Sequence, residues 1–302
     1  NMSAHLTRLV TLGSLTLDEI APSIPGLTEI HFIHAGGQKA VFKCTVNAVD
    51  YALKIVPLTN SQDGYGLSTA FNEYERRIQR EIDLLRRINC RHLVKLGPNI
   101  PSLATVRQTQ CIIYLEEWLD GNSLEHNVAS YGPYSTLQIK QVASAVIRAV
   151  GALHENNLIH RDIKPGNIMS VTGDEYRLID LGLVLDLDDV SLTGAGICGT
   201  IRYCSPEQLD PQKKRLLDFR SDLYSLGATL FYAATGVKPY SGSGASDLPN
   251  AIMFERLEPV IDINPAISPS CSEFIARLAQ KQPHSRFRSI DLALTALEEI
   301  AI

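Results

Sequence analysis

Hydrophobic and polar positions follow two different spacings along this chain. In its first part, short apolar runs bounded by polar turns predict β-strands. One longer stretch, 68–89, repeats apolar residues every three or four positions, which predicts a helix with one buried face that begins at Ser68 or Thr69. A sheet with one packed helix follows from this pattern. The expected strands are 30–32, 40–47, 50–57, 94–96 and 111–115.

The second part of the chain shows the helical spacing over most of its length. The first helix expected there is apolar nearly all round, so it should be buried. Two short strands, 167–171 and 176–179, would form a hairpin. The predicted fold class is α+β, with a small β-rich lobe, a hinge and a larger, mostly α-helical lobe, and ligands tend to bind between such lobes. The expected helices are 136–156, 219–235, 269–280 and 289–300.

Composition narrows the class of protein. The 302 residues are 45% hydrophobic, which is enough for a large core, and the net charge of −5 argues against a nucleic-acid-binding surface. No apolar run reaches the roughly 18 residues of a membrane span, and residues 1–20 do not resemble a signal peptide. The six cysteines include no Cys-x-x-Cys pair. Reduced thiols in a cytoplasmic protein are therefore the simpler interpretation.

Candidate chemistry is concentrated in one stretch of the second part. Asp162, Lys164 and Asn167 lie close together in sequence, and Asp180 follows at the far end of the predicted hairpin. One carboxylate can take a proton from an attacking hydroxyl, and a lysine can face a transferred phosphate. An amide oxygen and a second carboxylate can hold Mg²⁺. The alternative is that these are structural carboxylates in surface turns. Each further motif found in the chain favours the catalytic interpretation over this one.

The run 160–167, His-Arg-Asp-Ile-Lys-Pro-Gly-Asn, followed by Asp-Leu-Gly at 180–182, resembles the catalytic and magnesium loops of eukaryotic-type serine/threonine protein kinases. This resemblance implies that Asp162 is the catalytic base and that Lys164 neutralises charge on the phosphoryl group. It also implies that Asn167 and Asp180 bind Mg²⁺.

Further matches extend the resemblance along the chain. Thr200 matches the threonine that orients the catalytic aspartate and lysine, and Asp222 matches an aspartate that braces the catalytic loop. Glu207, in Ser-Pro-Glu, would form a buried ion pair with Arg286. The resemblance divides the chain into an N-terminal extension (1–28), a kinase N-lobe (29–116), a hinge (117–122) and a kinase C-lobe (123–302).

The strand 51–54, Tyr-Ala-Leu-Lys, resembles the kinase strand whose lysine contacts the ATP phosphates. Lys54 would then pair with Glu81 of the predicted helix, and Ala52 would line the nucleotide site. The simpler alternatives are a solvated lysine at a strand edge and a surface pair of Glu81 with Arg77.

The glycine loop that covers the phosphates is the most altered motif. In 34–41, His-Ala-Gly-Gly-Gln-Lys-Ala-Val, only Gly36 matches the family pattern in register, with Gly37 beside it. Glycines let backbone N–H groups approach phosphate oxygens, so the resemblance implies that both glycines and Val41 contact the nucleotide.

The segment 117–124 resembles the kinase hinge, where backbone groups of Glu117 and Leu119 would hydrogen-bond the adenine edge. Glu116 then falls at the back of the adenine pocket. A slip of one residue would place Leu115 there instead, and the sequence leaves both alternatives open.

Together these matches imply an enzyme that transfers the γ-phosphate of Mg-ATP to a Ser or Thr hydroxyl of a protein substrate. If it autophosphorylates its activation segment in trans, at Thr193 or Ser191, two copies must associate. The alternative is a pseudokinase that acts as a nucleotide-binding or scaffold module, which the altered glycine loop favours. A small-molecule kinase of the aminoglycoside or choline type shares the two-lobed fold but generally lacks the Lys-Pro-x-Asn and Ser-Pro-Glu elements.

Overall fold

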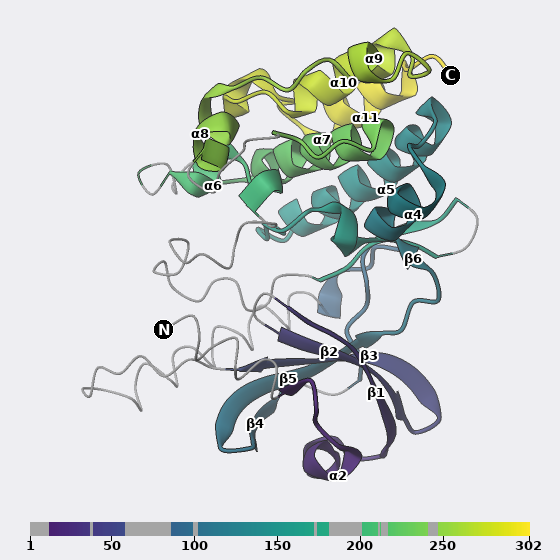
Figure 1. The fold of residues 1–302 in the computed structure, drawn as a ribbon, viewed down its shortest axis with the longest axis vertical. Helices are drawn as coiled ribbons and strands as arrows, with labels where there is room; N and C mark the ends of the chain where they lie inside the picture. Colours follow the sequence, from purple (N-terminus) through teal and green to yellow (C-terminus); the bar gives the residue numbers. More distant parts are fainter. Residues whose placement is uncertain are drawn as a thin grey trace. The chain divides into compact units, whose positions relative to one another are not determined.

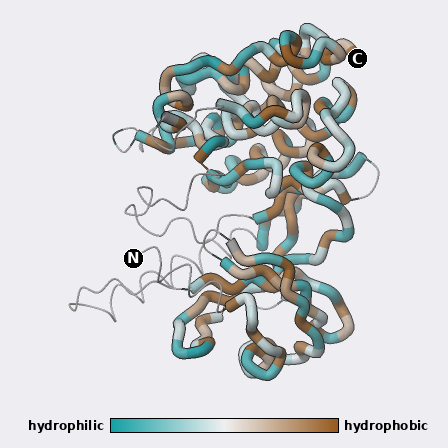
Figure 2. Tube along the Cα trace, in the orientation of Figure 1, coloured by the Kyte–Doolittle hydropathy of each residue, from teal (hydrophilic) through white to brown (hydrophobic). Residues whose placement is uncertain are grey.

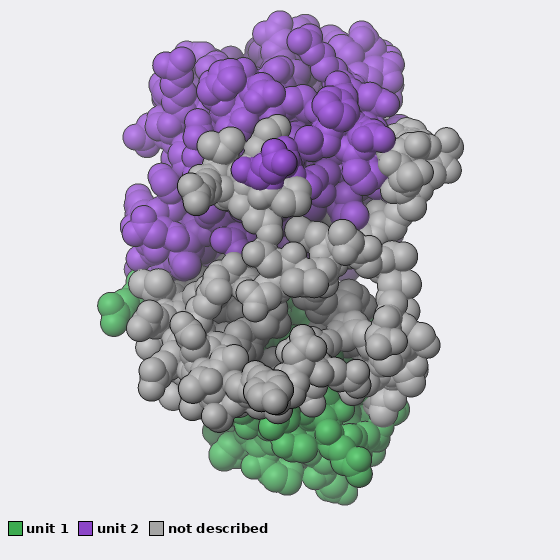
Figure 3. All heavy atoms as spheres, turned by 90° about the vertical axis from the view of Figure 1, so that its left-hand side faces the viewer, with its two compact units in different colours: residues 1–87, 95–118, 183–196 green, residues 88–94, 119–182, 197–302 purple. Residues whose placement is uncertain are grey.

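The computed structural model describes residues 12–36, 39–57, 86–98, 102–171, 174–180, 201–210, 212, 217–240 and 247–302. The chain divides into two compact units, shown in different colours in Figure 3. Unit 1 comprises residues 1–87, 95–118 and 183–196, and unit 2 comprises residues 88–94, 119–182 and 197–302.

Unit 1 is built on a five-stranded antiparallel sheet with the strand order β1-β2-β3-β5-β4 (Figure 1). Four of the five expected strands are confirmed, and β4 is an addition. The expected strand at 94–96 is wrong, because this stretch makes only one isolated bridge, from Leu96 to Glu116, and Leu93 just before it bridges to Leu178. The strands are β1 (Leu27–Gly36), β2 (Lys39–Val46), β3 (Val49–Pro57), β4 (Ser102–Val106) and β5 (Thr109–Glu117).

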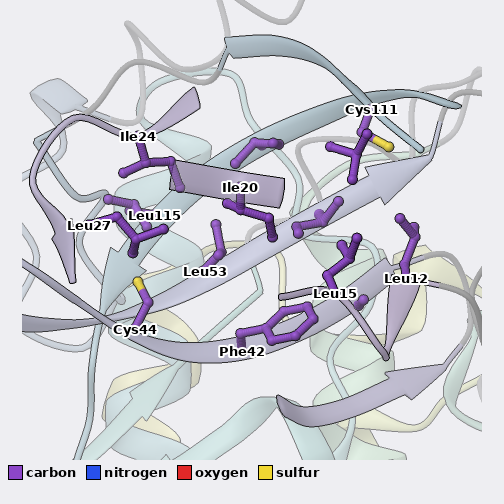
Figure 4. Packing of buried hydrophobic residues seen from close by; sticks show 14 of the residues in the cluster. Leu12, Leu15, Ile20, Ile24, Leu27, Phe42, Cys44, Leu53, Cys111 and Leu115 are labelled. Carbon is purple, nitrogen blue, oxygen red and sulfur yellow. The ribbon is translucent and has the colours of Figure 1, made fainter. Parts of the chain in front are cut away.

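Residues 12–27 cover one face of this sheet. This segment contains helix α2 (Leu17–Ile20) and the 3₁₀ helix η1 (Ala21–Ser23), and Ile20 and Ile24 join the apolar cluster on the strands (Figure 4). Ile20 packs in one cluster with Leu53 of β3 and Leu115 of β5, and all three are fully buried. Each such side chain contributes about 1.5–3 kcal/mol by leaving water. This segment is therefore part of the core of unit 1.

A polar clasp fastens α2 to the β4–β5 turn. Glu19 accepts hydrogen bonds from Arg107 Nε at 2.5 Å and Nη2 at 2.8 Å, and from the backbone N–H of Thr16 at 2.8 Å. Arg107 also donates to Ser14. The bonds from Arg107 and Thr16 lower the pKa of Glu19 from its ordinary 4.5 to about 2.

The variant Glu19→Gln should show the contribution of this clasp as a pH-dependent loss of stability. A carboxylate with a lowered folded-state pKa stabilises the fold above its unfolded pKa and loses this effect as the pH falls. The difference in unfolding free energy between wild type and variant should therefore be full above about pH 5 and shrink as the pH falls toward 2. Urea titrations at a series of pH values measure it, with Asp18→Asn as the matched control. A difference independent of pH would contradict the ion-pair account.

Unit 2 is mainly helical, as expected. The four expected helices are confirmed with ends shifted by up to two residues, as α5 (Thr136–His154), α7 (Phe219–Thr235), α10 (Pro269–Leu278) and α11 (Ile290–Glu298). None of the helices in the described residues has the length and apolar character needed to cross a membrane. The additional helices are short: α4 (Leu124–Tyr131), α6 (Pro206–Leu209), α8 (Asp247–Phe254) and α9 (Val260–Ile263), with the 3₁₀ helices η2 (Pro165–Asn167), η3 (Ile201–Tyr203) and η5 (Pro283–Ser285).

Helix α7 forms the centre of unit 2 and packs against α5 and α10. Every residue of α7 except Arg220 is buried, and hydrophobic positions run along both α7 and α5 (Figure 2). Asp218 caps its start by accepting from the N–H of Arg220, and Gly236 ends it with φ +71°, a conformation that favours glycine. The Asp218 cap fixes the first turn of α7, which carries Asp222.

A small sheet completes unit 2 next to the predicted catalytic stretch. Its strands are β6 (Asn122–Ser123), β7 (Ile168–Ser170) and β8 (Tyr176–Leu178), and β7 pairs antiparallel with β8. The expected hairpin is thus confirmed, with shorter strands. The expected α+β fold class is also confirmed. The expected helix at 68–89 falls almost entirely outside the described residues, as do Ser68 and Thr69.

Candidate functional site

The three polar residues of the predicted catalytic loop contact one another in unit 2. Lys164 Nζ donates to Asp162 Oδ2 at 2.8 Å, and Asn167 Nδ2 donates to the same oxygen at 2.9 Å. The Asn167 amide also donates to the Asp162 backbone carbonyl at 2.8 Å. The Asp162 side chain remains 11% exposed. Two donors on one oxygen fix the orientation of a carboxylate that solvent or a substrate can still reach.

Asp222 braces this loop from the buried helix α7. Its two carboxylate oxygens accept the backbone N–H groups of His160 and Arg161, each at 2.9 Å. Burial raises the pKa of Asp222, while these two donors act in the opposite direction. Arg161 has φ +67°, which a side chain with Cβ rarely adopts without support. The predicted brace is confirmed, and it fixes the backbone directly before Asp162.

The hairpin brings Asn167 and Asp180 to the same end of β7 and β8. The N–H of Ile179 donates to the Asn167 carbonyl at 2.8 Å, and the Ile179 carbonyl is 3.1 Å from His160 Nε2. Asp180 is buried and has φ +68°. Because the Asn167 amide nitrogen is bonded to Asp162, its side-chain oxygen is directed elsewhere. An amide oxygen and a carboxylate are hard oxygen ligands of the kind Mg²⁺ prefers, so this donor set fits the ion.

Lys54 forms a buried ion pair in unit 1 with a residue that sequence reasoning did not assign to it. Its Nζ lies 2.5 Å from Glu116 Oε2, with side-chain exposures of 4% and 2%. The expected partner, Glu81, lies outside the described residues. In the β3–β5 ladder, Ala52 is opposite Glu116, and Lys54 is opposite Tyr114. Alternate residues of a strand share a face, so Glu116 lies on the face of Lys54.

The sheet register shows which of Glu116 and Leu115 lies on the face of Lys54. Leu115 belongs to the core on the other face, with Leu53 and Ile20 (Figure 4). Glu116 is therefore the β5 residue beside Lys54. An acidic residue that ends an otherwise apolar strand, Cys-Ile-Ile-Tyr-Leu at 111–115, is the signal in the sequence that could have suggested this pairing.

The other residues expected to contact a nucleotide in unit 1 lie around Lys54. Val41 of β2 is opposite Lys54 in the ladder, and Ala52 is two positions away on β3, so the three share one face. Gly36 is the last residue of β1 and is opposite Lys39, the first residue of β2. Gly37 lies outside the described residues. The register thus places the described members of this group next to one another.

The expected hinge begins where β5 ends. The N–H of Glu117 donates to the Lys95 carbonyl at 2.9 Å, and the Lys95 N–H donates to Glu117 Oε1 at 2.8 Å. Since its N–H is used, a contact from Glu117 to a nucleobase would employ its carbonyl oxygen. Leu119 follows outside any helix or strand and is half-buried.

Glu207 and Arg286 form the expected buried ion pair. Arg286 Nη1 and Nη2 donate to the two carboxylate oxygens at 2.6 and 3.0 Å, and Ser221 Oγ donates at 2.7 Å. Burial by itself would raise the pKa of Glu207, but the bonds and charge of Arg286 outweigh it, so the pKa is lowered. This pair ties α6 to Arg286, directly after η5, and the Ser221 bond ties α6 to the start of α7. Thr200 and the candidate phosphorylation sites Thr193 and Ser191 lie outside the described residues.

The sequence matches the family model of the protein kinase domain over residues 27–296. The chain belongs to the protein kinase family. Two curated relatives are serine/threonine-protein kinases. PrkC of Bacillus subtilis is 25% identical over 266 residues, which are 87% of this chain and 38% of PrkC. PknD of Mycobacterium tuberculosis is 28% identical over 227 residues, which are 74% of this chain and 33% of PknD. The kinase chain therefore spans about a third of the length of these relatives.

Solved structures show the protein kinase fold. Rad53 1–466 in complex with AMP-PNP matches with a TM-score of 0.68 and 22% identity, covering 90% of this kinase chain and 64% of the Rad53 chain. The kinase domain of Mycobacterium tuberculosis PknI matches with a TM-score of 0.63 and 19% identity, covering 92% of this chain and 97% of the PknI chain. The five-stranded sheet followed by a mainly helical region is thus the fold of this family.

Proposed function

We propose that this chain is a serine/threonine protein kinase, which transfers the γ-phosphate of ATP to a Ser or Thr hydroxyl of a protein substrate. The observation that carries this proposal is the carboxylate of Asp162, held by Lys164 and Asn167 on a loop that Asp222 braces. A general base must be fixed and still reachable, and Asp162 meets both requirements.

The described side chains suit the individual steps of such a transfer. Asp162 accepts the proton of the attacking hydroxyl while the new bond from that oxygen to phosphorus forms. The bond from phosphorus to the bridging oxygen of ADP breaks, and Lys164 offsets negative charge on the transferred group. Lys54 of unit 1 holds the remaining phosphates. Asn167 and Asp180 would hold Mg²⁺, which would supply charge neutralisation at the phosphates.

Incubation of the wild-type chain with Mg-ATP and a generic protein substrate, followed by mass spectrometry, tests this function. We expect phosphate on Ser and Thr of the substrate, and on residues 185–200 of the chain itself if Thr193 or Ser191 is phosphorylated by a second copy. Removing Mg²⁺ with a chelator should abolish incorporation. Phosphate on Tyr alone would contradict the acceptor class. Nucleotide binding without transfer would favour the pseudokinase alternative, a nucleotide-binding or scaffold module.

A further inference from the structure

The Lys54–Glu116 pair is held by the sheet itself. Both residues sit in the same antiparallel ladder, on β3 and β5, where Ala52 is opposite Glu116 and Lys54 is opposite Tyr114. The Lys54 ammonium lies 2.5 Å from Glu116 Oε2 and 6.0 Å from the centre of the Tyr114 ring. Because the ladder fixes both backbones on one face, it keeps the carboxylate within reach of the lysine ammonium.

Packing alone does not require a carboxylate at this place. Ile112 and Tyr114, the preceding residues on the same face of β5, are buried and have hydrophobic bodies. Glu116 is 2% exposed, and its Oε1 has no hydrogen-bond partner among the described residues. A buried carboxylate oxygen left in this way costs stability, and apolar residues often replace buried ion pairs without loss. The described contact that distinguishes Glu116 from an apolar residue is the one to Lys54.

We propose that Glu116 is a positioning residue for Lys54, a carboxylate on β5 that sets where the lysine ammonium stands for the nucleotide phosphates. The inference rests on the proposed kinase function. The resemblance gives this task to Glu81 of the predicted helix, whose position depends on how that helix packs. A carboxylate in the neighbouring strand fixes Lys54 through the sheet, and this contact does not depend on the packing of the predicted helix.

Two measurements on the full chain test this inference. The first is the rate at which acetic anhydride acylates Lys54 in the absence of nucleotide, followed by peptide mass spectrometry. Glutamine has the shape of glutamate without its charge, and loss of the counter-charge favours the uncharged, nucleophilic amine. Glu116→Gln should therefore raise the rate at Lys54 about tenfold, with other lysines unchanged. Glu81→Gln should change this rate less than twofold, and Glu29→Gln, on the exposed edge of the same sheet, serves as the control.

The second measurement separates kcat from KM for ATP. A misplaced lysine holds the phosphates poorly in the transition state, so Glu116→Gln should lower kcat about tenfold, and Glu116→Asp should restore part of it. If Glu116→Gln does not unfold cooperatively, Glu116→Asp carries the test, because its shorter reach should still raise the Lys54 acylation rate severalfold.

The outcomes distinguish this inference from the proposed function. Suppose that Glu116→Gln leaves the Lys54 acylation rate unchanged and that the wild-type chain phosphorylates its substrate. This result overturns the inference and leaves the proposed function intact. A larger effect of Glu81→Gln than of Glu116→Gln overturns it as well. If Glu116→Gln raises the Lys54 acylation rate but the wild-type chain transfers no phosphate, the Lys54 contact is supported and the proposed function is overturned.

Discussion

Replacing Asp162 by asparagine is expected to slow phosphoryl transfer by about 10²- to 10⁴-fold, the range that a positioned general base contributes. Asparagine cannot accept the hydroxyl proton. Its amide also offers a donor toward Lys164 and Asn167, which both donate to the present carboxylate. The geometry of the loop should survive, because Asp222 holds the backbone of His160 and Arg161 through its own carboxylate.

Initial rates of phosphate incorporation, together with thermal unfolding of both proteins, measure this effect. Asp174→Asn removes the same charge from an exposed position on the β7–β8 hairpin and provides the matched control. Its rate should equal that of the wild type. Equal rates for Asp162→Asn and wild type would mean that Asp162 is not the base, and the proposed mechanism would have to be abandoned.

Replacing Arg286 by methionine is expected to lower the free energy of unfolding of unit 2 by about 3–5 kcal/mol, since removing one partner of a buried pair leaves the other charge uncompensated. Arg286 is 1% exposed and donates to both oxygens of Glu207. It also donates to the backbone carbonyls of Arg220, Gln280 and Lys281, so those acceptors lose a partner too. A domain of ordinary stability has about 5–15 kcal/mol in total, so the loss would be a large share.

Urea unfolding followed by far-ultraviolet circular dichroism measures this loss. Arg288→Met, two positions away and exposed, removes the same charge and should stay within about 0.5 kcal/mol of the wild type. The double variant Glu207→Leu with Arg286→Met should recover part of the stability, because it no longer buries an unpaired carboxylate. If Arg286→Met were as stable as Arg288→Met, the pair would have no structural role.

The local pattern of apolar and polar residues was enough to predict much of the fold. Helix α7 is marked by a long apolar run between Asp218 and Gly236, and its caps are short-range features of the sequence. The short helix α2 has too few residues to show a periodicity, so its place in the core could not be predicted. Its burial depends on the face of the sheet that it covers.

Prediction of the candidate site required two kinds of information. The spacing of Asp162, Lys164 and Asn167 in sequence was enough to predict that they act together, because all three belong to one loop. Their side chains do contact one another. Glu207 and Arg286 are far apart in sequence, and only the resemblance to a known family predicted their ion pair. Periodicity carries no information about which two distant charges will meet.

By itself, the sequence determined the α+β fold class, the family resemblance and the residues of the catalytic loop, because these depend on neighbouring positions. Only the tertiary structure showed that the carboxylate of Glu116 lies beside Lys54. A shift of one residue in the pairing of β3 with β5 would turn Leu115 toward Lys54 and Glu116 toward the core. The register of these two strands is set by the packing of the whole sheet, and it places Glu116 on the lysine.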